Sequence, residues 1–106
     1  MAGHSLCPKF EKAFQILGKR WSGVIIHVLE DGAMRFNEIA DHIPHISQKM
    51  LSDRLKSLEE EGIIQRHVYP ETPVRIEYSL TDKGKALAPA LKEVQSWANQ
   101  WVDLTK

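Results

Sequence analysis

The sequence predicts a mainly α-helical fold with one small β-hairpin, arranged as a winged helix-turn-helix. Apolar residues recur at helical spacing over most of the chain. They alternate with polar residues only from Val74 to Leu80, which is the pattern of a strand. A proline at position 44 separates a short helical segment from a longer one just before that strand. The order of helix, tight turn, long helix and hairpin is that of the winged helix-turn-helix.

The composition predicts one domain spanning residues 1–106. Of the 106 residues, 42% are hydrophobic, which suits a single modest core. No apolar run approaches the roughly 18 residues needed to cross a membrane, and Met1–Leu6 lacks the regions of a signal peptide. We therefore expect a cytoplasmic protein with no membrane partner. The 14 basic and 14 acidic residues balance, so any attraction for nucleic acid must be local.

Two helices are expected in the first third of the chain. The first spans about residues 8–17: Pro8 suits its first position, and Phe10 and Phe14 recur at helical spacing. The second runs roughly from Arg20 to Asp31 and is stopped by a glycine. Its apolar stripe indicates a helix that faces the core.

A helix-turn-helix is expected at about residues 36–61. The short helix ends before Pro44, because the residue preceding a proline is pushed out of the helical region. Ser47 then caps a longer helix by accepting a hydrogen bond from an unpaired backbone N–H, and Gly62 ends that helix as a left-handed residue. The buried stripe of the longer helix consists of Leu51, Leu55 and Leu58.

The polar face of the longer helix is suited to contact a groove of double-stranded DNA. At about 100° per residue, the far side from the leucines carries short or flexible polar groups. Lysine and arginine neutralise phosphates, glutamine can bond an adenine edge, and serine serves base or backbone. These residues are Lys49, Ser52, Asp53 and Lys56, with Gln48 at the edge of that side and Arg54 on one flank. The alternative is an ordinary solvated face on which Lys49 pairs with Asp53.

A β-hairpin is expected at about residues 64–80. Ile64–Tyr69 pairs with the alternating strand, one face of which should be buried, and the loop between them is stiffened by Pro70 and Pro73. Such a wing can lay Arg75 along a minor groove, where narrow A·T-rich stretches concentrate negative potential. Alternatively, the hairpin is plain surface and Arg75 pairs across the strands with a carboxylate.

An amphipathic helix is expected at about residues 82–103. Thr81 caps it, and Pro89 kinks it by removing one backbone donor. Its apolar stripe exceeds what a small winged domain can cover, so we expect it and the first helix to form a homodimer interface. The alternative is that it folds back on its own subunit. The predicted interface residues are Phe10, Phe14, Leu91, Val94, Trp97 and Trp101.

Cys7 is the only cysteine, which excludes an internal disulfide and a multi-thiolate zinc site. It lies near a helix N-terminus with Lys9 and Lys12 close by, and both features favour a thiolate that reacts with oxidants or electrophiles. The alternative is a small buried apolar residue. No histidine pair has metal-ligand spacing and no catalytic motif is present, so we expect no metal, no cofactor and no enzymatic activity.

Several short motifs occur in order along nearly the whole chain: Cys7-Pro8, Leu17-Gly18-Lys19-Arg20-Trp21, Arg35-Phe36-Asn37-Glu38-Ile39, Ile46-Ser47-Gln48-Lys49-Met50-Leu51, Leu55, Gly62-Ile63-Ile64, Glu77-Tyr78-Ser79-Leu80-Thr81 and Lys83-Gly84. In these motifs the chain resembles the HxlR-type family of bacterial, MarR-like winged helix-turn-helix regulators. The resemblance implies a homodimeric transcription factor, and some members of the family sense oxidants or electrophiles through a thiol near position 7. The family usually has two glycines before its Lys-Trp pair, whereas this chain has Lys19-Arg20 and so one more positive charge.

The sequence therefore predicts a transcriptional repressor that binds an inverted-repeat operator as a homodimer and senses oxidants or electrophiles through Cys7. The predicted DNA contacts are Lys19, Arg20, Ser47, Gln48, Lys49, Ser52, Arg54, Lys56 and Arg75. Two alternatives stay open. One is a regulator that binds a small aromatic effector and has no thiol sensing. The other is a winged-helix module that binds another protein, for which the zero net charge and the two C-terminal tryptophans are the supporting features.

Overall fold

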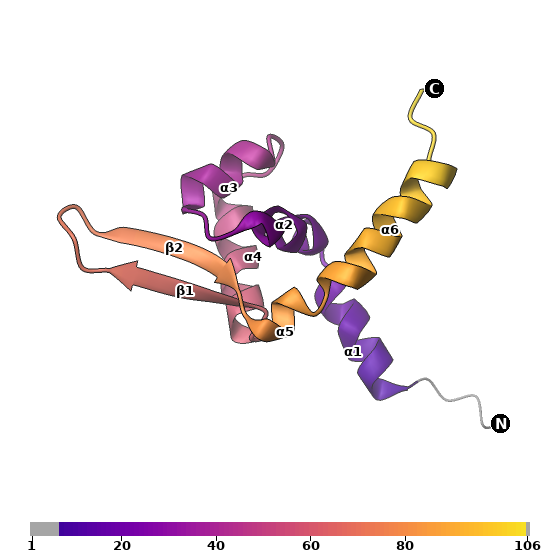
Figure 1. Cartoon of the computed structure of the whole chain (residues 1–106), viewed down its shortest axis with the longest axis horizontal. Helices are drawn as coiled ribbons and strands as arrows, with labels where there is room; N and C mark the ends of the chain where they lie inside the picture. The colour runs from indigo at the N-terminus through magenta and orange to yellow at the C-terminus, as the bar shows by residue number, and fades with distance from the viewer. Residues whose placement is uncertain (1–6, 106) are drawn as a thin grey trace.

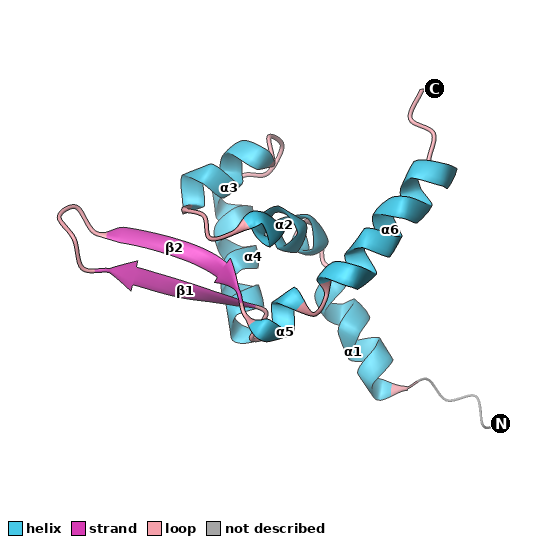
Figure 2. Cartoon of the chain, in the orientation of Figure 1, coloured by secondary structure: helices cyan, strands magenta, loops and turns pink. Residues whose placement is uncertain are grey.

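The computed structural model describes residues 7–105, so the expectation for Met1–Leu6 lies outside the described residues. Helices make up most of it, and the two strands form one antiparallel hairpin (Figure 2). The predicted fold class is thus confirmed. In chain order the elements are α1 (Pro8–Leu17), α2 (Ser22–Val28), the 3-10 turn η1 (Leu29–Asp31), α3 (Phe36–His42), α4 (Gln48–Glu60), β1 (Ile64–Tyr69), β2 (Arg75–Leu80), α5 (Asp82–Lys85) and α6 (Ala88–Trp101).

Local capping determines where α4 begins and ends. The hydroxyl of Ser47 accepts a hydrogen bond of 3.0 Å from the backbone N–H of Met50. At the other end Gly62 adopts φ 76°, the left-handed conformation that glycine reaches without strain. Both predictions are confirmed. The leucine stripe of this helix is also buried, as expected.

The second helix is shorter than predicted. The expected span from Arg20 to Asp31 is wrong at its start, because Trp21 adopts a left-handed φ of 79° and α2 begins only at Ser22. Its last turn, Leu29–Asp31, tightens into a 3-10 helix, as commonly happens at helix ends.

The predicted continuous helix at 82–103 is wrong, because α5 and α6 are separate. Thr81 caps α5 by accepting a hydrogen bond of 3.1 Å from the N–H of Gly84. Gly84 packs so closely on the hairpin base that a Cβ there would collide with the carbonyl oxygen of Ile63. Pro89 therefore does not kink a helix. It lies in the first turn of α6, where its missing N–H leaves no hydrogen bond unmade.

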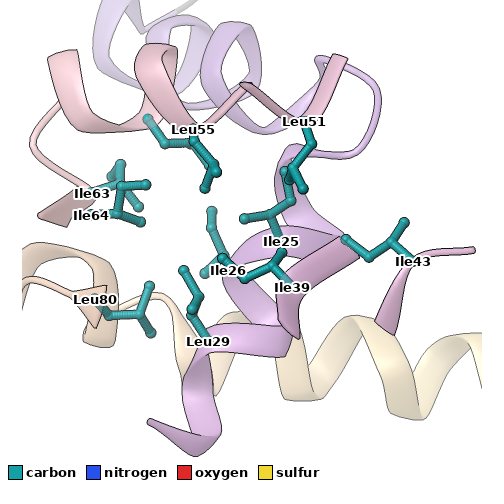
Figure 3. Close-up of a cluster of buried hydrophobic side chains, with 11 residues drawn as sticks. Ile25, Ile26, Leu29, Ile39, Ile43, Leu51, Leu55, Ile63, Ile64 and Leu80 are labelled. Atoms are coloured by element: carbon teal, nitrogen blue, oxygen red, sulfur yellow. The ribbon is translucent and has the colours of Figure 1, made fainter. Parts of the chain in front are cut away.

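The core lies where α2, α3 and α4 meet the base of the hairpin. Figure 3 shows these buried aliphatic side chains facing one another from all of those elements. The cluster consists of Ile25, Ile26, Leu29, Ile39, Ile43, Leu51, Leu55, Leu58, Ile63, Ile64 and Leu80. Leucine and isoleucine in such a cluster fill the interior without leaving any polar group to be satisfied.

The hairpin and the terminal helices project from opposite sides of this core (Figure 1). The expectation that the alternating strand buries one face is wrong beyond its base, because Ile64 and Leu80 are the only buried residues of the two strands. Val74 lies outside β2 and is 55% exposed. On the other side, α1 and α6 diverge, and neither contains a buried residue. None of the helices described is long and apolar enough to span a bilayer.

Candidate nucleic-acid interface

The outward face of α4 presents four exposed polar side chains, those of Gln48, Lys49, Ser52 and Lys56. The opposite face is locked into the core by its leucines, so this surface is held on a rigid element. Lys49 forms an ion pair of 3.4 Å with Asp53, which is the pairing that a plain solvated face would show. The lysine side chain is nevertheless 86% exposed. Exposed pairs of this kind contribute about 0.3–0.5 kcal/mol, so a phosphate can replace the aspartate.

Three of the predicted backbone contacts lie together on one flank of α4. The Nε of Arg54 donates a hydrogen bond of 2.8 Å to the backbone oxygen of Arg20. The ammonium of Lys19 donates one of 3.3 Å to the hydroxyl of Ser57. The guanidinium of Arg20 stands 4.6 Å from the ring centre of Trp21. These cations therefore also connect the α1–α2 turn to α4.

Arg75 is held within the hairpin. Its guanidinium bonds to Glu71 at 3.0 Å and to Glu77 at 3.2 Å, and it lies 3.9 Å from the ring centre of Tyr69. The Arg75 side chain is 30% exposed, and its Nε has no hydrogen-bond partner among the described residues. The alternative that Arg75 pairs with a carboxylate is thus right, but the predicted position of the partner is wrong. Glu71 lies in the loop and Glu77 on the same strand as Arg75, not on the facing strand.

Sequence reasoning missed Tyr69 as a partner of Arg75. The two residues face each other in the antiparallel register of β1 and β2. The expected strand began at Val74, whereas β2 begins at Arg75, so the pairing implied by the sequence was offset by one residue and did not put Arg75 opposite Tyr69.

The terminal helices expose most of the residues predicted for a dimer interface. Trp97 and Trp101 are 60% and 66% exposed, and the rings of Phe10 and Phe14 stand 5.0 Å apart on the surface of α1. Leu91 differs, because it is half-buried against the core of its own chain. An apolar groove runs between α2 and α6, lined by Gly23, Val24, His27, Leu91, Val94, Gln95 and Ala98.

Cys7 is exposed and is the N-cap residue of α1. The alternative of a buried cysteine is therefore wrong. Of the two lysines expected near it, Lys12 is directed elsewhere and pairs with Glu61 at 3.0 Å. Within residues 7–105, no group of three or more His, Cys, Asp or Glu side chains is arranged to hold a metal ion.

The HxlR-like helix-turn-helix family matches residues 16–106 of the chain. The HTH-type transcriptional regulator YodB of Bacillus subtilis is 56% identical over 101 residues, which cover 95% of this chain and 90% of YodB. A second regulator of that organism, YvaP, is 58% identical over 98 residues, covering 92% of this chain and 91% of YvaP.

Solved structures of similar proteins have the same fold. The reduced form of YodB from B. subtilis is 55% identical and superposes with a TM-score of 0.83, covering 96% of this chain and all of that one. The quinone-bound form of YodB has a TM-score of 0.79 at 53% identity, with 91% and 100% covered. The redox regulator HypR in its oxidised form has a TM-score of 0.86 at 37% identity, with 92% and 100% covered.

Proposed function

Since this chain belongs to the HxlR-like helix-turn-helix family of transcriptional regulators, we propose that it represses transcription as a homodimer bound to an inverted-repeat operator. The observation that carries the proposal is the outward face of α4, an exposed polar surface backed by three buried leucines. A helix held in this way presents its side chains to a major groove at fixed positions, which is what base recognition needs. Repression follows if the operator overlaps a promoter and excludes polymerase.

In the proposed complex, α4 of each subunit enters a major groove, and the two grooves lie about 34 Å apart on one side of the duplex. Gln48, Lys49 and Ser52 contact bases, because they are exposed polar side chains in the first two turns of the helix, the end that reads base edges in a helix-turn-helix. The hairpin lies over the flanking minor groove. The backbone contacts are Lys19, Arg20, Ser47, Arg54 and Lys56, together with Arg75 once it has left its two carboxylates.

The homodimer is proposed because the terminal helices carry more exposed apolar surface than a monomer leaves open. Phe14, Val94 and Trp97 are each at least 57% exposed. Exposed apolar side chains gathered on two terminal helices mark interaction surfaces, and closed twofold symmetry is the commonest way to bury them. The groove between α2 and α6 is open and apolar, so it is suited to receive aromatic side chains from the second subunit.

Cys7 is the proposed sensor, because its sulfur is exposed at the N-terminus of a helix that belongs to the dimer surface. A quinone is the proposed electrophile, given the similarity to YodB, which has a quinone-bound structure. The sulfur adds to a ring carbon, and the thiol proton and the proton of that carbon end on the two quinone oxygens. The product is a hydroquinone thioether. An oxidant would instead give a sulfenic acid or a disulfide to a second molecule, since the chain has one thiol.

A small aromatic effector is a second candidate, and one cavity favours it. The cavity has a volume of about 160 Å³ and is lined by Ala13, Ile16, Leu17, Ile63, Lys83 and Leu87. The pocket opens to solvent, but its volume and mostly apolar lining suit one aromatic ring. Thermal-shift measurements with small aromatic compounds and Cys7→Ser protein test this role, because a ligand that binds only the folded state raises the unfolding midpoint without any thiol.

The proposed function is tested by selecting genomic fragments on the purified full chain at moderate salt and sequencing those retained. A repressor dimer is expected to enrich a palindrome with half-sites one helical turn or a multiple apart. Fragments without a common sequence, retained by a protein that elutes as a monomer, would contradict the proposal and favour a protein-binding module.

A further inference from the structure

A second face of α4, beside the outward one, is tied to other parts of the chain. Arg54, Ser57 and Glu61 follow one another at spacings of three and four, so they share one side of the helix axis. Arg54 donates a hydrogen bond to the α1–α2 turn, and Ser57 accepts one from it, as described above. Glu61 receives contacts from α1 and α5. The end of α4 opposite Gln48 is thus connected to both terminal segments.

Glu61 differs from the other two because lysines from two separate helices hold it. Its carboxylate pairs with the ammonium of Lys12 on α1 at 3.0 Å. Its backbone oxygen accepts a hydrogen bond of 2.7 Å from Lys83 on α5. Glu61 is the C-cap of α4, where exposed carbonyl groups and the negative end of the helix dipole favour a cation. The last turn of α4 is therefore fixed between α1 and α5 by two charged side chains.

Packing fixes the position of α1 only in part, through Ile16 and Leu17, which pack against the core at the C-terminal end of the helix. No residue of α1 is buried, and the apolar cavity of about 160 Å³ lies between α1 and the residues that follow α4. A helix over an incompletely filled space has fewer close contacts to resist a tilt. The Lys12–Glu61 ion pair is a direct bond between α1 and α4, and it holds the two helices at a set distance.

We propose that Glu61 is a positioning residue that, through Lys12, sets the orientation of the α1 arm relative to α4. The inference rests on the proposed function, because operator binding is its main consequence. Cys7 caps the same helix that carries Lys12, so a group added to the sulfur acts on the arm that holds Glu61. The pair can change operator affinity by about fivefold at most, because both of its side chains are partly exposed.

Charge reversal on each side of the pair tests this role. Lys12→Glu and Glu61→Lys are each expected to weaken operator binding up to about fivefold, and the double reversal is expected to restore it to within about twofold. Lys9→Glu and Glu60→Lys are matched controls. They make the same charge changes on exposed neighbours in the same two helices, and neither neighbour forms an ion pair among the described residues. The controls are expected to change operator and non-specific DNA binding alike.

Single reversals that match their controls, or a double reversal that fails to restore binding, would overturn the inference. Amide hydrogen exchange gives a readout that needs no operator. Lys12→Glu is expected to speed exchange in the last turn of α4 relative to Lys9→Glu, and equal exchange would overturn the inference too. A parent protein that enriches no palindrome contradicts the proposed function instead, so the two failures are distinguishable.

Discussion

The outward face of α4 and the β1–β2 hairpin differ in how they hold their cations. Lys49 is 86% exposed and has one long ion pair with Asp53. Arg75 is 30% exposed and is held by two carboxylates and the ring of Tyr69. Lys49 can exchange its partner for a phosphate at little cost, whereas Arg75 must give up three interactions first. The residue type alone therefore does not decide which cation is available to DNA.

The two regions also differ in what supports them. The outward face of α4 is backed by Leu51, Leu55 and Leu58, which are nearly or fully buried. The hairpin is anchored only at its base, and Val68 near its far end is 45% exposed. The geometry of the α4 surface thus depends on the core, while that of the hairpin tip depends on contacts made within the tip.

The largest predicted effect is on the free energy of unfolding. It distinguishes support from the core, as in α4, from support by contacts within the hairpin. Leu55→Ala removes a side chain that is 1% exposed, so it is expected to lower the free energy of unfolding by about 2–5 kcal/mol. Val68→Ala is expected to change it by about 0.5 kcal/mol or less, as surface substitutions usually do. Urea denaturation followed by circular dichroism measures both. Equal losses would mean that the hairpin is packed as the core is.

The second prediction concerns base recognition by α4. Gln48→Ala is expected to weaken operator binding by about 1–3 kcal/mol, because a bidentate contact to adenine is lost. The preference for one base pair in each half-site should fall with it. Gln65→Ala is the matched control on the hairpin, where Gln65 donates a hydrogen bond to Ser79. Binding to operators with each base pair replaced in turn measures both variants. Retained preference at every position would exclude Gln48 from base contact.

The third prediction compares the two cations directly. Lys49→Ala is expected to weaken operator binding and to reduce the slope of log affinity against log salt by about 0.9, the value for one phosphate contact. Arg75→Ala is expected to change the slope in the same direction but by less, because its charge is already neutralised by Glu71 and Glu77. Binding titrations over a range of salt concentrations measure both slopes. Unchanged affinity and slope in both variants would remove both residues from the interface.

Features of the fold that depend on near neighbours were predictable from the sequence. Ser47 caps α4 through a residue three positions later, and Gly62 ends it through its own backbone freedom. The division between α5 and α6 was not predictable from periodicity, because an apolar stripe continues across it. The local signal for the break is Pro89, which has no N–H to bond to a carbonyl oxygen one turn back and lies at the start of α6.

The residues of the candidate site likewise divide into those that the local sequence could place and those that it could not. The outward residues of α4 follow from rotation about one helix, so Lys49 and Ser52 could be placed on that face, with Gln48 at its edge, without a structure. The ion-pair partners of a charged side chain cannot be placed by rotation about one helix when they come from elsewhere in the chain. Glu61, for example, pairs with Lys12, and the two are 49 positions apart.

The smallest predicted effect is a gain in operator binding, whereas replacing Gln48, Lys49 or Arg75 weakens it. This effect tests the hairpin by itself. Replacing both Glu71 and Glu77 by glutamine removes the two carboxylates that neutralise Arg75 while keeping the side-chain shapes. The freed guanidinium is expected to strengthen operator binding by about fivefold or less, because the glutamine oxygens still accept hydrogen bonds from Arg75 and only part of each ion pair is lost, and to steepen the salt slope. Adding Arg75→Ala should cancel the gain in slope. A gain that survives this third substitution would come from reduced repulsion of phosphates by the hairpin, and Arg75 would then have no direct part in DNA binding.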